Sequence, residues 1–414
     1  MPATTDTTAV PTTATAVPTA AAPPAVLVSA REVPWGRARE LAHRAPLPLT
    51  ARTVPLAEAA GLTTADELRT RRPLPAFDTA AMDGYAVAGP GPWRVLGAVR
   101  AGSVRKGTLT PGEAVEISTG APVPAGTRAV LPLEPASVGA GRVSGPLPAP
   151  GEHIRRAGED APAGARLAPA GTRVGPALLG LAASCGHDAL RVRPRPRVGV
   201  FVTGDELDRS GLPGPGRVRD ALGPLLPPLV TAFGGEVVAV EHVPDRPAGL
   251  LAPAVRGARG PEVVVVTGST SVGATDQLRA FLRDAGARMV VDTVACRPGH
   301  PQLLAGLADG RWVVGLPGNP YAALVAAHTL LAPLIAGLSG RPLPALPQVA
   351  VSGDVRPVPG VARLVPVAWE GAGARVVGGH RAAFLRGAAV GDALAVIGDG
   401  WSDGAPAPLL LPTG

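Results

Sequence analysis

The sequence predicts a multidomain α/β protein whose central domain is a doubly wound sheet with a parallel core. From Arg197 onward, short apolar β-branched runs alternate with segments of helical spacing, which is typical of such a sheet. The chain has 414 residues, enough for about two to four domains. Short alternating strands bounded by Gly and Pro occupy residues 93–143 and 348–397. They predict a small β domain before the α/β segment and a C-terminal β barrel or sandwich after it.

Composition restricts the function classes. The formal net charge of +7 is spread along the chain, and basic runs are no longer than pairs such as Arg71-Arg72. This distribution suits small anionic ligands and argues against an extended nucleic-acid surface. Apolar runs fall short of the ~18–20 residues of a membrane span, and the N-terminus lacks a signal-peptide pattern. Cys185 and Cys296 have no metal-ligand spacing, so we expect two buried, reduced thiols in a cytoplasmic protein without membrane contact.

The first part of the chain predicts a tail, a helix and a β segment. Residues 1–26 are rich in Ala, Thr and Pro, and we expect disorder because they cannot bury enough surface to offset ordering entropy. A helix follows at 34–45. The Pro-rich segment 72–84 predicts a loop that enters a strand at Tyr85. Thr119 begins a rigid Thr-Gly and Pro-x-Pro-x-Gly loop, which either directs Thr119 at a ligand or only connects two strands.

The remaining elements follow from periodicity and from helix start and stop signals. Asn319 as N-cap and Pro320 at the first position predict the start of a long apolar helix. The expected helices are 176–185, 218–233, 250–255, one from about 274, and 320–338. The expected strands are 198–202, 237–240, 263–266, 289–294, a hairpin at 302–314, and 348–351, 363–369 and 393–397.

Polar residues gather at the expected carboxyl ends of the parallel strands, where ligands bind in doubly wound sheets. They are Thr203 to Glu206, Asp245, Gly268 to Gly273, and Asp276. A buried strand that breaks into a Gly/Ser/Thr loop before a helix presents backbone N–H groups to an oxyanion. A carboxylate beside such an anion needs a cation such as Mg²⁺ between them. We therefore expect one anion-plus-metal site; the alternative is a turn that binds no ligand.

Short motifs carry a family resemblance. In chain order they are PAFDTAAMDGYA at 75–86, STGAPVP at 118–124, GED at 158–160, TGDEL at 203–207, SVG at 271–273 with Asp276, RPG at 297–299 and LPGNP at 316–320. Their identity and order resemble those of the molybdopterin molybdenumtransferases, the MoeA and gephyrin E-domain family.

The resemblance implies insertion of molybdate into adenylylated molybdopterin, with release of AMP and assistance from Mg²⁺. It implies a homodimer, no nucleic-acid partner, and contacts with other molybdenum cofactor biosynthesis proteins. It also implies an MoCF-type α/β domain with an elongated linker domain, a small β domain and a C-terminal β-barrel domain. The expected boundaries are 1–26 for the tail, 27–55 with 145–195 for the linker domain, 56–144 for the small β domain, 196–342 for the α/β domain and 343–414 for the barrel.

Site residues carry over motif by motif. The resemblance implies catalytic roles for Asp83, Thr119, Glu206, Asp245 and Asp276, with Asp83 and Thr119 reaching the site across the dimer. The residues implied to bind substrate and anion are Gly268, Ser269, Ser271, Gly273, Arg297, His300, Pro317, Gly318 and Asn319. The implied metal set is Asp205, Glu206, Asp245 and Asp276, and the supporting residues are Asp160 and Arg363.

The sequence departs from the family pattern near the site. Ser269 replaces the second glycine of the anion loop, and Arg297 and His300 replace lysines beside Pro-Gly. Residues 220–222 (Asp-Ala-Leu) lose two polar groups, and residues 381–383 (Arg-Ala-Ala) lose a hydroxyl. Three readings follow: a working transferase, a paralogue that binds molybdopterin or a partner protein without turnover, and a nucleotide pyrophosphatase. The Met-Asp-Gly-Tyr domain and the C-terminal β segment argue against the last.

Overall fold

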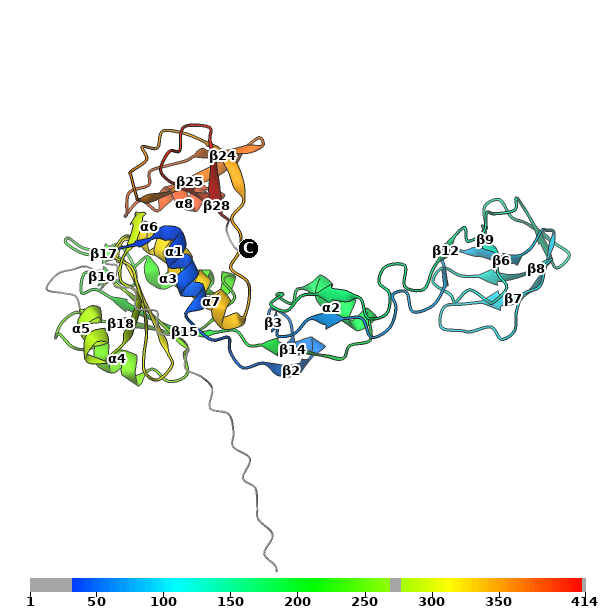
Figure 1. Cartoon of the computed structure of the whole chain (residues 1–414), viewed down its shortest axis with the longest axis horizontal. Helices are drawn as coiled ribbons and strands as arrows, with labels where there is room; N and C mark the ends of the chain where they lie inside the picture. Colours follow the sequence, from blue (N-terminus) through cyan, green and yellow to red (C-terminus); the bar gives the residue numbers. More distant parts are fainter. Residues whose placement is uncertain (1–31, 269–276, 412–414) are drawn as a thin grey trace, which may run out of the picture.

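The computed structural model describes residues 32–268 and 277–411. Figure 1 shows an α/β domain, a β domain beside it that contains the C-terminal strands, and an arm that leads through a linker domain to a distant β domain. The expected disordered tail, 1–26, lies outside the described residues. The multidomain α/β architecture predicted from the sequence is confirmed.

The α/β domain is built on a six-stranded sheet in the order β18-β15-β19-β23-β22-β20. Its strands are β15 (Arg197–Thr203), β18 (Glu236–Val243), β19 (Val263–Thr267), β20 (Arg288–Val291), β22 (Leu303–Gly306) and β23 (Trp312–Leu316). The first four strands in the sheet order run parallel, and β22 pairs antiparallel with both of its neighbours, β23 and β20. The expected parallel core and the 302–314 hairpin are therefore present.

Both faces of this sheet are covered, which explains why β19 is apolar from Val263 to Val266. Val263 and Val265 belong to a core that includes α1 (Trp35–Arg44) and α3 (Leu222–Ala232). Val264 and Val266 point to the opposite core, with α4 (Leu251–Gly257) and α5 (Gln277–Asp284). Side chains alternate across a strand, so a strand between two helical layers needs apolar residues on both faces.

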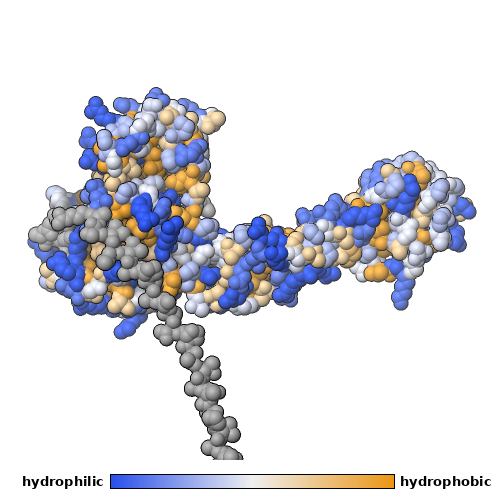
Figure 2. Space-filling view, viewed as in Figure 1, coloured by the Kyte–Doolittle hydropathy of each residue, from blue (hydrophilic) through white to orange (hydrophobic). Residues whose placement is uncertain are grey.

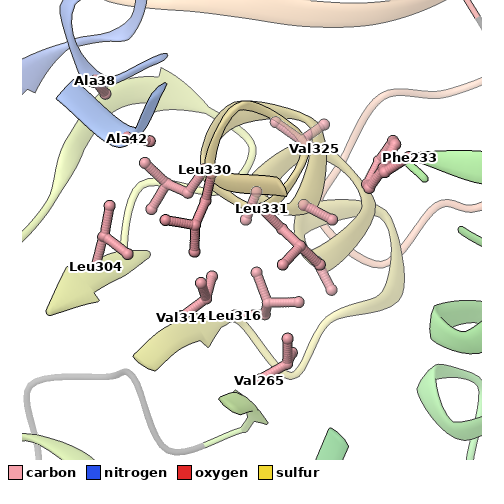
Figure 3. Close-up of a cluster of buried hydrophobic side chains, with 14 of the residues drawn as sticks. Ala38, Ala42, Phe233, Val265, Leu304, Val314, Leu316, Val325, Leu330 and Leu331 are labelled. Carbon is pink, nitrogen blue, oxygen red and sulfur yellow. The ribbon is translucent and has the colours of Figure 1, made fainter. Parts of the chain in front are cut away.

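The predicted long apolar helix runs from Pro320 to Ser339. It consists of α6 (Pro320–Ala326), a π turn (Ala327–Leu331) and α7 (Ala332–Ser339). Figure 3 shows Leu330 and Leu331 packed over Val314 and Leu316. Among the described residues it is the one helix long and apolar enough to span a membrane, but 83% of its most apolar stretch is buried inside the protein. It is a core helix of the α/β domain.

Two predicted elements have other boundaries in the structure. The helix expected at 218–233 begins only at Leu222, because Oδ1 of Asp220 accepts the N–H groups of Leu222 and Gly223 and fixes the start of α3 there. Residues Val218–Arg219 instead form strand β17, which pairs with β16 (Leu207–Asp208). The single strand expected at 289–294 is two strands, β20 and β21 (Val294–Arg297), which join different sheets.

Strand β21 and the two-residue strand β1 (Val33–Pro34) extend the sheet of the C-terminal domain. That domain contains β24 (Gln348–Ser352), β25 (Ala362–Glu370), β26 (Gly373–Val376), β27 (Ala393–Ile397), β28 (Pro406–Leu410) and helix α8 (Arg386–Val390). Strand β25 pairs with both β26 and β27, so the five strands close into a barrel. Parallel pairing of β21 with β25 ties the barrel to the α/β domain.

The linker domain combines two distant chain segments. Strands β2 (Arg52–Pro55) and β3 (Thr63–Thr64) pair with β14 (Ala189–Arg193), and β4 (Leu68–Arg69) pairs with β13 (Arg166–Ala168). The 3-10 turn Leu56–Glu58 and helix α2 (Pro176–Ser184) complete it. Ala59 and Leu68 share its core with Val54 and Leu190, so residues 56–69 pack with this domain and not with the β domain expected at 56–144.

The distal β domain begins near Thr79. Strand β5 (Thr79–Ala80) pairs with β12 (Ile154–Arg155), and a six-stranded sheet follows in the order β10-β11-β7-β8-β6-β9. Its strands are β6 (Gly84–Ala88), β7 (Trp93–Val99), β8 (Glu113–Ile117), β9 (Ala129–Pro132), β10 (Ser137–Gly139) and β11 (Arg142–Ser144).

Helix α1, expected in the linker domain, packs on the α/β core. Cys185 and Cys296 are free and buried, as expected.

Candidate active site

A pocket of about 580 Å³ opens at the carboxyl ends of β15, β19 and β23. Parallel strands end at this edge, so the loops that follow them supply its walls. The lining residues are Thr203, Gly204, Glu206, Leu207, Val218, Arg219, Asp220, Ala221, Leu222, Asp245, Thr267, Gly268, Gly318, Asn319, Pro320 and Ala383. Of the residues predicted for the site, Glu206, Asp245, Gly268, Gly318 and Asn319 meet here; Pro317 is buried just before them.

Glycine is required where the strand ends approach each other. Gly268 has a φ of +86°, and a Cβ there would lie 2.8 Å from Oγ1 and 2.9 Å from the carbonyl oxygen of Thr203. A Cβ on Gly318 would lie 3.3 Å from Cα of Gly268. Oγ1 of Thr203 also donates to the Thr267 carbonyl at 2.6 Å. These contacts hold the backbone of three strand ends against the pocket, as an anion-binding loop requires.

Three carboxylates follow β15 and β18. The backbone N–H of Asp245 donates to Oδ1 of Asp205 at 2.9 Å, which joins the two strand ends. Glu206 and Asp245 both line the pocket. Burial raises the pKa of Asp245, and the neighbouring charges of Asp205 and Glu206 raise it further. This excess of negative charge is an environment that stabilises a bound cation.

Polar donors line the same pocket. Asn319 is at the N-cap position of α6, as predicted, but its side chain makes no capping hydrogen bond and is exposed at the pocket. The amide and the N-terminus of a 20-residue helix are therefore available to an anionic ligand. Oγ1 of Thr267 is buried and has no hydrogen-bond partner among the described residues.

Sequence reasoning missed Arg219 as a site residue. It is the cationic side chain among the described residues that line the pocket. One of its Nη atoms donates to the Asp208 carbonyl at 3.2 Å, and the side chain remains exposed. Arg219 could have been predicted from the sequence, because it directly precedes Asp220 and the family pattern places residues 220–222 near the site.

Asp220 shapes the pocket wall from within. Its side chain is 5% exposed, and its Oδ1 atom accepts the N–H groups of Leu222 and Gly223. Its Oδ2 atom lies 2.9 Å from Nε2 of His242. Burial acts to raise its pKa, but the hydrogen bonds from Gly223, His242 and Leu222 outweigh burial and leave the pKa lowered. Asp220 is therefore an ionised anchor for α3, although Ala221 and Leu222 beside it bring no polar side chain.

The barrel contributes to the same pocket. The N–H of Ala322 in α6 donates to the Ala382 carbonyl at 3.0 Å, and Ala383 lines the pocket. The segment 381–383, singled out for its missing hydroxyl, therefore reaches the site through the first turn of α6.

Arg297 and His300 do not line the pocket. Their turn packs on α6, where a Cβ on Gly299 would lie 3.3 Å from the Ala322 carbonyl oxygen. Arg297 is exposed and pairs in register with Arg363 of β25. Nη1 of Arg363 donates to the Arg356 carbonyl at 2.8 Å, and its Nε is buried without a partner among the described residues. Nε2 of His300 lies 3.2 Å from the carboxylate of Glu32.

Asp83 and Thr119 form a separate unit on the distal β domain. Oδ1 of Asp83 accepts the N–H of Thr119 at 2.6 Å and its hydroxyl at 3.0 Å. These hydrogen bonds, the N–H bond first, lower the pKa of Asp83, and Arg100 adds a smaller effect. Figure 1 places this domain at the far end of the arm, so one chain does not bring Asp83 and Thr119 to the pocket.

The joint between the linker and distal β domains has its own anchors. The N–H of Asp160 donates to the Leu74 carbonyl at 3.0 Å. Asp78, which sequence reasoning missed, accepts the Ala157 N–H at 2.9 Å and Nη1 of Arg156 at 2.6 Å. The Ala157 bond is the main cause that lowers the pKa of Asp78.

Four predicted site residues lie outside the described residues: Ser269, Ser271, Gly273 and Asp276. Within the described ranges, no three His, Cys, Asp or Glu side chains converge as a preformed metal centre. Mg²⁺ does not require one, because it is commonly held by one or two carboxylates together with water and substrate phosphates. Glu206 and Asp245 fit that kind of site.

Comparisons with known proteins identify the family of the chain. A family model described as MoeA N-terminal region (domain I and II) matches residues 33–186, and one described as a probable molybdopterin binding domain matches residues 199–337. Molybdopterin molybdenumtransferase 2 of Mycobacterium tuberculosis is 37% identical over 313 residues, covering 72% of this chain and 77% of the relative. The molybdopterin molybdenumtransferase of Synechococcus elongatus is 36% identical over 312 residues, covering 71% and 77%.

Solved structures show the same fold. Two crystal structures of the molybdopterin biosynthesis MoeA protein from Pyrococcus horikoshii match with TM-scores of 0.72 and 0.76, at 25% and 22% identity. Each match covers 92% of this chain and 100% of the other. The chain belongs to the MoeA family of molybdopterin molybdenumtransferases, enzymes of molybdenum cofactor biosynthesis.

Proposed function

We propose that this chain inserts molybdate into adenylylated molybdopterin and releases AMP. The observation that supports this most directly is the pocket at the carboxyl ends of β15, β19 and β23, which combines donors for an anion with an excess of carboxylate charge. Cleavage of a phosphoric anhydride depends mainly on charge neutralisation and positioning. The pocket provides groups for both.

Donors on one wall would bind the phosphates. Gly268 and Gly318 leave room for close approach of a phosphate to the backbone, and the amide of Asn319 is free to donate to it. The N-terminus of α6 adds a favourable dipole. Arg219, which also lines the pocket, would place a permanent positive charge beside the anhydride.

Glu206 and Asp245 would hold Mg²⁺ together with the substrate phosphates, with Asp205 orienting Asp245 through its backbone and Asp276 as a further ligand. When bound, Mg²⁺ neutralises phosphate charge that develops on cleavage. Loss of the ion would leave the mutual repulsion of Asp205, Glu206 and Asp245 unbalanced, consistent with the raised pKa of Asp245.

The site would be completed by a second copy of the chain. In this homodimer, the arm would carry Asp83 and Thr119 to the pocket of the partner, since within one chain they lie at the far end of the arm. The lowered pKa of Asp83 keeps its carboxylate ionised for that role. Asp160 would act indirectly by holding the joint at the base of the distal β domain.

Molybdate would bind beside the pocket, where Arg297 and His300 replace lysines. The Arg297–Arg363 register pair supplies two guanidinium groups at the contact between α6 and the barrel. Glu32 lies against His300, so His300 would contribute less than a lysine at that position. The chain would act in the cytoplasm, and other cofactor-assembly proteins would be its further partners.

The test is AMP release from adenylylated molybdopterin by the purified full chain, measured with and without molybdate and with Mg²⁺ or EDTA. We expect release that requires both molybdate and Mg²⁺. Tight binding of the adenylylated pterin without release would instead support a paralogue that binds the pterin but does not turn it over. AMP release at the same rate with and without molybdate would instead support a nucleotide pyrophosphatase.

A further inference from the structure

A second pocket, of about 210 Å³, lies where the α/β domain meets the barrel. Figure 2 shows that apolar residues gather at this contact between the two domains. We call it the interdomain pocket; its lining is Arg39, Phe233, His328, Ala332, Pro333, Ala336, Arg341, Pro344, Ala345, Leu346, Pro347, Leu409, Leu410 and Leu411. It shares no lining residue with the pocket at the strand ends.

Arg39 is the unusual residue of this lining. It lies on α1 and is only 8% exposed, yet within the described residues it has no ion-pair or side-chain hydrogen-bond partner. Its Nε atom is fully buried, and its guanidinium lies over the ring of Trp35 at 5.1 Å. Arginine stays charged in proteins, and a buried charge without a partner is strongly unfavourable. The protein retains a positive charge here that its own described side chains do not neutralise.

The rest of the lining selects the kind of anion. The other polar side chains are Arg341 and His328, and there is no acidic residue among the fourteen that line the pocket. Arg341 already donates to the Phe233 carbonyl, and the edge of the His328 ring packs against Phe233 with ring centres 5.0 Å apart. Among the described residues, Arg39 is thus the lining cation without a hydrogen-bond partner, and the remaining walls are aliphatic apart from the ring of Phe233. A single guanidinium without a hydrogen-bond partner, set among mainly apolar walls, favours an anion with an apolar body over phosphate or molybdate.

We propose that the interdomain pocket binds a monocarboxylate with a short apolar chain, such as a medium-chain fatty acid. The carboxylate pairs with the guanidinium of Arg39, and the chain lies against Pro333, Leu346 and Leu410. A carboxylate and a guanidinium form two parallel charge-assisted hydrogen bonds, which suits a partly enclosed site. Since Leu410 belongs to β28 of the barrel and Pro333 to α7, the ligand contacts both domains and holds them together.

Three probes of equal length separate charge from hydrophobicity: octanoate, 1-octanol and octylamine. Calorimetric titration of the full chain should show saturable octanoate binding, with 1-octanol weaker by about 10-fold or more and octylamine without binding. Octanoate should also raise the unfolding temperature in a concentration-dependent way. Equal binding of octanoate and 1-octanol would show a nonspecific apolar cavity and would overturn the proposal.

The variant Arg39→Met tests the residue itself. Replacing an unpaired buried charge by an apolar side chain of similar length should leave the free protein at least as stable, while octanoate affinity falls by about 10-fold or more. Arg37→Met is the control, because Arg37 lies on the same helix with its side chain 47% exposed and paired with Glu40. It should bind octanoate as the unaltered chain does.

Two outcomes contradict the proposal. The first is an Arg39→Met protein that is less stable but binds octanoate normally, which would give Arg39 a purely structural role. The second is octanoate binding that appears only after residues 412–414 are removed, which would assign the interdomain pocket to the chain's own end.

Discussion

The backbone N–H of Asp245 donates a 2.9 Å hydrogen bond to Oδ1 of Asp205, so the ends of two adjacent parallel strands are joined by an acidic pair. Asp245 lines a pocket that also contains Glu206. Burial and these like charges raise the pKa of Asp245. A protein keeps such repulsion where the charge serves a ligand.

Asp245→Asn should therefore lower the activity of the protein without lowering its stability. Removing the charge relieves repulsion, so the free protein should unfold at the same or a slightly higher temperature at pH 7. The same change should lower molybdate-dependent AMP release by about 10²-fold, the usual cost of losing one electrostatic group in an active site. Thermal unfolding and AMP release measured on one preparation check both parts.

The control is Asp309→Asn, because Asp309 lies in the β22–β23 turn and pairs with Arg311 away from the pocket. It should leave AMP release unchanged. If Asp245→Asn unfolds at a clearly lower temperature, Asp245 is a structural residue and its assigned role is wrong.

Gly268→Ala should damage both fold and function. Alanine at a φ of +86° costs about 1–2 kcal/mol, and the new Cβ would also press on Thr203. Gly310→Ala is a matched control, since Gly310 has a φ of +88° but open space around its Cβ position. Urea unfolding should show a larger loss of stability for Gly268→Ala, and only that variant should lose AMP release. Equal losses would mean that the close approach to Thr203 is unimportant.

The parts of this fold that sequence patterns predict are those set by local periodicity. The four valines of β19 indicated a buried parallel strand, and the strand-end rule located Glu206, Asp245 and Gly268 at one pocket. What periodicity could not predict depends on distant segments, and only the family resemblance pointed to residues 381–383. Ala383 reaches the pocket because the Ala322 N–H bonds to Ala382 some sixty residues later in the chain.

The same limit explains the errors in the strands. Val294–Arg297 looks like a continuation of β20, but its partners are β1 and β25, which lie far away in sequence. The start of α3 was misplaced because the hydrogen bonds of Asp220 decide it, and the prolines nearby masked that signal. Helical and strand periods carry no information about which domain an element joins.

His328 should make stability depend on pH. Burial, with a smaller contribution from the charge of Arg39, lowers its pKa to about 4, below the usual value near ~6.5. Its partial exposure is to the two cavities that it lines. The unfolded chain then binds the proton more readily, so this contribution is fully favourable above about pH 6.5 and is lost as pH falls toward 4.

His328→Gln should remove that loss. Between pH 7 and pH 5, the unaltered chain should lose about 1–2 kcal/mol more unfolding free energy than the variant. Urea unfolding at the two pH values measures the difference. If both proteins lose the same unfolding free energy between pH 7 and pH 5, His328 titrates normally in the folded state.

The measurement that tests the account most directly is complementation between Asp83→Asn and Asp245→Asn. Each variant alone should be nearly inactive in molybdate-dependent AMP release. If the site combines the pocket of one protomer with the Asp83–Thr119 unit of its partner, unfolding the variants together and refolding them at equal concentrations should restore about a quarter of the sites. Such recovery is the predicted result. No recovery, with both variants folded and dimeric, would contradict a site shared between two chains.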